Sequence, residues 1–403
     1  MCIYRIQVSS RYICGKRIPL QCCGNVCPFG PGKWKMLVSR DRGDNSKHYW
    51  VCKMSGEVER VEDAESAVEK VRKGEGAHVC RGLTYKFLGH YRGQREDRFE
   101  EGLRLTRFID IYLEGEEGEG CEIAIIDSGA SEEAPSKAKI SIYEASIINS
   151  EEHGKYIHSI IHRLLPKANI HIIQVLEEEG AVPDYVVITA LKNCIELKVH
   201  AVNLSIQSEW WSDGCDPLSL YVNYLSKEKK IAVVVAAGNG GPRMMSIGSP
   251  GAAKYAITVG ATDTKGRLWR HSSRGPTLDG RFKPDLVAPG LFTLNGVALK
   301  GTSFAAPWVT AAASILNRDI KSAIATRRIL HLSSRPLPLD FQADRILIFK
   351  EKRSRSVEKL AKIFSDQLSL IFDSRNIFGA GLLDVKSAVD IKNELFSEIK
   401  SIV

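Results

Sequence analysis

The chain has 403 residues and a formal net charge of +8, and 44% of its residues are hydrophobic and 26% charged. This length suits one large α/β domain with a smaller companion, and no apolar run is long enough to span a membrane. The absence of repeats and of long low-complexity tracts excludes solenoids and repetitive fibres.

The first hundred residues predict a small α/β unit with a basic start. Residues 1–60 hold eleven Lys or Arg and four Asp or Glu, about +7 of the net charge. A solvated basic face is the default interpretation, and without an aromatic-basic RNA motif we do not expect nucleic acid as a partner. The predicted elements are strands at 34–38, 48–53 and 83–88 and a helix at 63–73.

Four of the ten cysteines cluster near the N-terminus. They are Cys14, Cys22, Cys23 and Cys27. Their spacing lacks a clean pair of C-x-x-C units, so free thiols in a reducing compartment fit better than a zinc site. The first residues are mixed and interrupted by arginines, unlike a secretory signal, so we expect a cytoplasmic protein without a membrane partner. The sequence does not indicate the oligomeric state.

An acidic stretch rich in glycine, 114–120, separates the N-terminal unit from the rest of the chain. It predicts an exposed linker at 106–120, between a unit at 1–105 and a main domain at 121–403. The apolar run at 121–126 then predicts a buried strand that ends at Asp127. In α/β folds the carboxyl end of a strand is where functional sites lie.

His153 begins a predicted helix whose apolar residues share its face. They are Ile157, Ile160, Ile161 and Leu164. Histidines in such positions are more often packed in a core than catalytic. Between residues 202 and 259, apolar strands alternate with helical stretches such as 218–229. This pattern predicts a mostly parallel sheet with helices on both faces.

Asn239 follows the apolar strand at 231–237, and its amide could donate a hydrogen bond to a developing oxyanion. The alternative is an ordinary turn asparagine. Ser303 lies between a glycine turn at Gly301 and a helix at 308–316 rich in alanine. This places its hydroxyl at the positive end of a buried helix, although a plain serine cap has the same pattern.

In combination, these residues resemble the subtilisin-like serine peptidases, in which Asp, His and Ser follow one another in this order. The similar segments are 125–129, 153–154, 236–239, 272–276, 283–290, 301–307 and 379–384. The resemblance implies the family's α/β fold. It also implies that Asp127 orients His153, that His153 acts as general base and then acid, and that Ser303 forms an acyl-enzyme. Asn239 and the Ser303 amide would hold the oxyanion.

The resemblance also implies a substrate-binding edge formed by Ser205, Ile206, Gln207, Ala237 and Gly238. Gln207 departs from the family, which has glycine there, and its side chain would narrow or fill the primary pocket. We therefore expect an endopeptidase with a restricted range of peptide or protein substrates, as in maturation. The alternative is a binding protein that keeps the fold but is catalytically silent.

Two further regions depend on the same resemblance. Related peptidases often carry an inhibitory prodomain, but the cysteine-rich start here does not resemble one, which favours a permanent recognition domain over a prodomain. Residues 319–378 exceed the family's usual tail and predict an insertion with a strand at 345–349 and a helix at 356–370. Catalysis requires no cofactor, and a structural calcium ion is compatible with the family although its ligands are not assigned.

Overall fold

In the computed structural model, residues 97–129, 151–175, 181–208, 211–337 and 373–402 are described, together with 138–141. Before residue 97 the described part consists of short strands and the single residues Ser66 and Lys70. These strands are β1 (Ser10–Arg11), β2 (Val38–Ser39), β3 (Tyr49–Cys52), β4 (Val58–Val61), β5 (His78–Arg81), β6 (Thr84–Phe87) and β7 (His90–Gln94). β3 lies between β4 and β5 in an antiparallel sheet.

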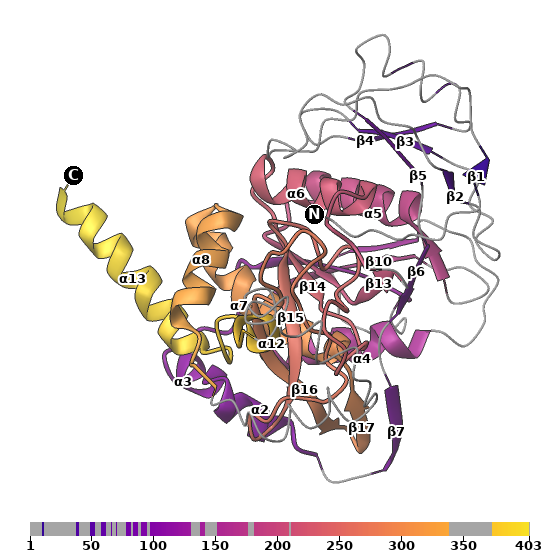
Figure 1. The fold of residues 1–403 in the computed structure, drawn as a ribbon. Helices are drawn as coiled ribbons and strands as arrows, with labels where there is room; N and C mark the ends of the chain where they lie inside the picture. Colours follow the sequence, from indigo (N-terminus) through magenta and orange to yellow (C-terminus); the bar gives the residue numbers. More distant parts are fainter. Residues whose placement is uncertain are drawn as a thin grey trace.

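A nine-stranded sheet forms the centre of the molecule (Figure 1). Its order is β7-β17-β16-β15-β14-β12-β8-β10-β9, in which the strands from β16 to β9 pair in parallel and β17 and β7 pair antiparallel at one edge. The new strands are β8 (Glu122–Asp127), β9 (Ala138–Ser141), β10 (Asn169–Gln174), β12 (Ala201–Leu204), β14 (Ala232–Ala236), β15 (Ile257–Asp263), β16 (Leu286–Leu294) and β17 (Val297–Lys300). Their near-continuous apolar sequences are typical of parallel strands buried on both faces.

Helices cover both faces of this sheet. One face carries α2 (Phe99–Leu105), α3 (Phe108–Leu113), α4 (Glu151–Leu164), α7 (Thr302–Ile320), α8 (Ala323–Ser333) and α13 (Val385–Ile402), and the other carries α5 (Asp184–Glu196) and α6 (Pro217–Lys227). Alternate residues of β8 show the division: Ile123 and Ile125 pack in the first layer, whereas Ala124 and Ile126 pack in the second. The predicted α/β fold, mostly parallel with helices on both faces, is confirmed. Among the described helices, none is long and apolar enough to cross a bilayer.

Helix α7 is the central helix of the first layer, and its residues 302–317 are all buried. The Trp308 ring stacks on Phe99 of α2 at 4.8 Å and meets Phe108 of α3 edge-on at 6.0 Å. Burying each such aromatic side chain stabilises the fold by about 1.5–3 kcal/mol. Residues 99–113 therefore belong to the core that carries α7.

The predicted exposed linker at 106–120 does not match this arrangement. Phe108 and Ile111 have no exposed surface, and Glu116 forms an ion pair with Arg318 at 2.8 Å. The acidic composition of 114–120 favoured a linker, although the apolar residues Phe108 and Ile111 just before it form a buried helix face. Its glycines serve turns with positive φ at residues 115, 118 and 120 rather than a flexible connection.

Other predicted elements can be compared only in part. The strands expected at 48–53 and 83–88 contain β3 and β6, and the one at 34–38 reaches β2 only at Val38. Most of the helix expected at 63–73 lies outside the described residues. Of the region 319–378, α7 continues to Ile320, and α8 and α12 (Arg375–Phe378) are helical. The strand at 345–349 and the helix at 356–370 also lie outside the described residues.

Candidate active site

Asp127 and His153 form a buried pair. Asp127 is the last residue of β8, and His153 lies in the first turn of α4. The His153 Nδ1 and Asp127 Oδ1 atoms are 2.7 Å apart, and Oδ1 also accepts a hydrogen bond from the Ser128 N–H at 2.8 Å. An ionised carboxylate only accepts hydrogen bonds, so Nδ1 carries the proton and Nε2 is the basic nitrogen of the ring.

Gly154 allows this pair to form. A Cβ atom at this position would lie 1.8 Å from the carbonyl oxygen of Gly129, in the loop after β8. The Gly154 N–H instead donates to Ser128 Oγ at 3.0 Å. The start of α4 therefore rests directly on that loop, and only a residue without a side chain fits after His153.

Ser303 lies in the first turn of α7 and has no exposed surface. Its Oγ donates to the Ser205 carbonyl at 3.3 Å. The ring of Phe304, the next residue, is 5.6 Å from the His153 ring, so α7 brings Ser303 beside the Asp127–His153 pair. The start of α7, which carries Ser303, therefore lies next to the start of α4, which carries His153.

A buried hydrogen-bond chain fixes the start of α7 against β12. Pro307 has no N–H, so the Ser303 carbonyl lacks its usual helical partner four residues on. The Ser205 hydroxyl donates to this carbonyl at 3.1 Å. It accepts from Asn203 Nδ2 at 3.0 Å, and the Asn203 Oδ1 accepts from Thr310 at 3.0 Å. These hydrogen bonds give each of the buried polar groups a partner and hold Ser303 in place.

Asn239 is held by Thr302, the residue before Ser303. Its Oδ1 accepts from the Thr302 N–H at 3.1 Å and from the Thr302 hydroxyl at 2.9 Å. The same hydroxyl accepts from the Gly238 N–H at 3.1 Å. Because the amide oxygen is engaged in this way, the Nδ2 group is the end that can donate to a ligand near Ser303.

Gln207 covers the predicted substrate-binding edge. Gly238 has φ +104°, and a Cβ atom on it would lie 1.8 Å from Gln207 Oε1. Gln207 Nε2 donates to the Ser246 carbonyl at 3.1 Å. The side chain therefore lies across Gly238, between β13 (Ile206–Ser208) and the turn after β14, in the space expected for the primary pocket. Ala237, beside it, is fixed by its N–H bond to the Val259 carbonyl at 2.9 Å.

The same edge is paired with a strand of the chain's own N-terminal part. β6 lies between β13 and β11 (Ala181–Pro183), antiparallel to both, with Phe87 opposite Ile206. Close to the start of α7, β7 pairs with β17 and places His90 opposite Lys300. The strand at 83–88 is predictable from its pattern, but its partner, about 120 residues further along the chain, carries no local signal.

A second buried polar cluster joins α8 to the start of β16. Lys283 Nζ contacts Asp285 Oδ2 at 2.6 Å and donates to the Ala256 carbonyl at 2.8 Å. Burial lowers the pKa of Lys283 to about 7 although Asp285 opposes this change. Burial alone would raise the pKa of Asp285, but Arg327, Lys283 and His331 hold it well below its usual value. We assign this cluster to the anchoring of α8, not to the catalytic centre.

Within the described ranges, no group of three or more His, Cys, Asp or Glu residues is placed to hold a metal ion. Cys14, Cys22, Cys23 and Cys27 lie outside these ranges, so their predicted lack of zinc stays a prediction. The same holds for structural calcium.

Known proteins resemble this chain over the region that contains the candidate active site. The model of the subtilase family matches residues 118–331. Pyrolysin of Pyrococcus furiosus is 30% identical over 193 residues, 39% of this chain and 14% of its own length. The human membrane-bound transcription factor site-1 protease is 28% identical over 256 residues, 57% of this chain and 24% of its own.

A shorter relative aligns over most of its own length. The major intracellular serine protease of Bacillus subtilis is 24% identical over 275 residues, 60% of this chain and 83% of its own. By contrast, the chain spans less than a quarter of pyrolysin and of the site-1 protease. The range matched by the family model, 118–331, contains the parallel strands from β8 to β16 and helix α7.

Proposed function

Since this chain belongs to the subtilase family, we propose that it is a serine endopeptidase with Ser303 as its nucleophile. The contact that supports this most strongly is the buried 2.7 Å pairing of His153 with Asp127, beside the helix that carries Ser303. A serine hydroxyl is a weak nucleophile until a histidine oriented in this way takes its proton.

In the proposed reaction, His153 Nε2 removes the proton from Ser303 Oγ as Oγ attacks the carbonyl carbon of the cut bond. The oxyanion that forms accepts hydrogen bonds from Asn239 Nδ2 and the Ser303 N–H. His153 then gives its proton to the leaving amine, and an acyl-enzyme remains. Water, deprotonated by His153, attacks the ester and releases the acid and the free Ser303 hydroxyl.

A catalytically silent binding protein is the alternative from another class. It would need neither the Asp127–His153 pair nor the Thr302 contacts that hold Asn239. Buried polar groups kept in this arrangement cost stability unless they are fully paired. Their retention supports the enzyme, and the Ser303 variant described in the Discussion separates the two.

We propose that Gln207 restricts the substrates to those with a small residue before the cut bond. The Gln207→Gly variant should therefore accept large apolar residues there, with kcat/KM raised about 10- to 200-fold, the range that pocket shape controls. The measurement is kcat/KM on fluorogenic peptides that differ only at this residue. Gln207→Asn, one methylene shorter, should give an intermediate gain.

Two outcomes would contradict this role of Gln207. One is an unchanged peptide profile in the Gln207→Gly variant. The other is extensive cleavage of unfolded casein by the unaltered enzyme, because a filled pocket excludes most residues. Equal folding of both variants, checked by thermal unfolding, ensures that the comparison reports on the pocket.

We further propose that β6 makes the N-terminal unit an inhibitory prodomain, which replaces the expectation of a permanent domain. β6 uses the backbone groups of β13 that a peptide substrate would need, and Ser303 is buried. Phe87 is paired with Ile206, the residue after Ser205, and the Ser205 carbonyl accepts a hydrogen bond from Ser303 Oγ. His90 is paired with Lys300, three residues before Ser303. We therefore expect self-cleavage at one of the peptide bonds between Phe87 and His90.

The purified wild-type chain should cut itself at one of these three bonds, whereas Ser303→Ala should stay intact. Intact-mass spectrometry of both proteins, incubated side by side, measures this. Mixing the variant with a trace of the wild type reveals whether one molecule can cut another. An uncut wild-type chain that hydrolyses peptides would instead make the N-terminal unit permanent.

A further inference from the structure

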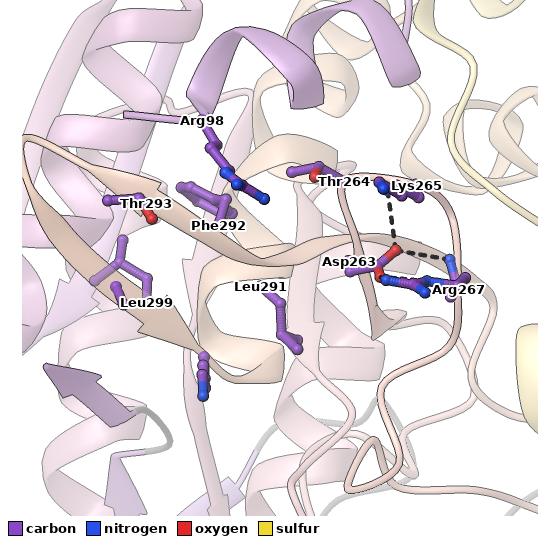
Figure 2. Close-up of a pocket in the computed structure, with 11 residues that line it drawn as sticks. Arg98, Asp263, Thr264, Lys265, Arg267, Leu291, Phe292, Thr293 and Leu299 are labelled. Atoms are coloured by element: carbon purple, nitrogen blue, oxygen red, sulfur yellow. Dashed lines mark hydrogen bonds and ion pairs between the residues drawn. The ribbon is translucent and has the colours of Figure 1, made fainter. Parts of the chain in front are cut away.

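A pocket of about 300 Å³ lies beside β16 and β17 (Figure 2), and its lining does not include Asp127, His153 or Ser303. Four cationic residues line it: Arg98 before α2, Lys265 and Arg267 in the turn after β15, and Lys300 at the end of β17. Among the described residues that line it, Asp263 is the one carboxylate. Its volume is at the lower end of the range for ligand pockets and is large enough for an amino-acid side chain.

The pocket keeps a positive charge because Asp263 is already engaged. Asp263 Oδ1 accepts from the Lys265 and Arg267 N–H groups, each at 2.9 Å, and Oδ2 accepts from Arg267 Nε at 2.7 Å (Figure 2). Arg98 faces Glu101 at 4.0 Å, with 55% of its side chain exposed, a weak pairing. In the described part of the chain, neither Lys265 nor Lys300 forms an ion pair with a carboxylate.

The pocket lies beside β17, the strand that precedes Ser303, and β17 pairs with β7, the segment that follows the bonds proposed to be cut. Lys300 precedes Ser303 by three residues, a span of at most about 10 Å. β7 occupies the edge of β17 here, with His90 opposite Lys300 and Arg92 opposite Ala298. Residues directly opposite in antiparallel strands share one face of the sheet. Both Lys300 and Ala298 line the pocket.

The segment that now occupies this edge is poorly matched to the pocket in charge. β7 has the sequence His-Tyr-Arg-Gly-Gln, without a carboxylate. Its residues opposite Lys300 and Ala298 are a histidine and an arginine, so this segment offers no negative charge to the cationic pocket. A peptide with Glu or Asp at these positions would be better matched.

We propose that this pocket is a subsite for a carboxylate side chain of the peptide substrate, on the C-terminal side of the cut bond. The inference rests on the proposed peptidase function and names a class of substrate for it. Lys265, Arg98 and Lys300 supply the attraction, and an acidic substrate displaces β7 more readily than a neutral one does.

The test uses fluorogenic peptides that are identical before the cut bond and carry one Glu or one Gln at each of the first four positions after it. The full chain, in its final cleavage state, should hydrolyse the best Glu peptide with a kcat/KM about five- to tenfold above its Gln partner, as expected for one or two partly exposed ion pairs. About 0.5 M NaCl should reduce this ratio towards one, because salt screens exposed charges.

Charge reversal locates the effect. Lys265→Glu should remove or invert the preference for Glu. Lys192→Glu, on the exposed side of α5, is the matched control and should leave the preference unchanged. Lys peptides should become the better substrates of the Lys265→Glu variant.

Equal rates for Glu and Gln peptides, or a preference that survives Lys265→Glu, would overturn the subsite and leave the peptidase function standing. Failure to hydrolyse any peptide, by a chain whose Ser303 is accessible to a fluorophosphonate, would overturn the proposed function and, with it, the premise of the subsite. The Gln peptides therefore test the peptidase function, and the comparison of Glu with Gln peptides tests the pocket.

Discussion

Replacing Ser303 by alanine should reduce kcat for peptide hydrolysis on the order of a millionfold, the loss expected when a triad nucleophile is removed. The Ser303 hydroxyl oxygen forms the covalent bond to the substrate in the proposed acyl-enzyme. Alanine fits the first turn of α7 well and gives up a single 3.3 Å hydrogen bond to Ser205. The variant should therefore fold normally and bind substrate with little change. Single-turnover and steady-state assays on the best peptide measure the loss.

Ser314→Ala is the matched control for this experiment. Ser314 is also fully buried in α7, and its hydroxyl donates to the Ala311 carbonyl at 2.8 Å. Its replacement removes the same atom from the same helix, so activity should stay within about twofold while stability changes by about 1 kcal/mol. Residual hydrolysis by Ser303→Ala at a few per cent of the wild-type rate would refute the assigned nucleophile.

Asp127→Asn should lower kcat by about ten-thousandfold with little change in KM. Asp127 holds His153 through Nδ1 and contacts no part of the substrate in the proposed reaction. An amide at this position can present an N–H to Nδ1, which places the proton on Nε2 and removes the base. It also lacks the negative charge that stabilises the imidazolium. In that orientation the amide gives up the hydrogen bond from the Ser128 N–H, a loss of about 1 kcal/mol, so the fold should persist.

The measurement for Asp127→Asn is the pH dependence of kcat together with thermal unfolding. If the variant is slow because His153 no longer acts as a base, activity should recover in part at high pH, where hydroxide can replace the general base. A loss of less than tenfold at neutral pH would show that the 2.7 Å contact does not serve catalysis.

Local patterns predicted much of the peptidase fold. The apolar run before Asp127 is a strand because continuous apolar residues suit a strand buried on both faces. The helical spacing after His153 predicted α4, whose residues Ile157 and Ile161 have no exposed surface. The roles of Asp127, His153 and Ser303 came from their order in the family and stay predictions, now with a geometry that supports them.

Long-range pairings were beyond the reach of such patterns. Nothing in the sequence of β6 indicates that it lies between β11 and β13, because strand pairing depends on contacts distant in the chain. The burial of Phe108 was likewise missed, since its partner Trp308 is 200 residues away. The sequence likewise does not indicate that the Ser205 hydroxyl donates to the Ser303 carbonyl in place of the missing Pro307 N–H.

Labelling with a fluorophosphonate tests the central claim most directly. Trypsin cleavage after Lys300 and Arg318 gives one peptide, beginning at Gly301, that contains Ser303. Mass spectrometry of this peptide should find the adduct on Ser303 in the wild type and none in Asp127→Asn over the same time. An adduct on another serine, or an unmodified Ser303 in chains already cut between Phe87 and His90, would contradict the proposed active site.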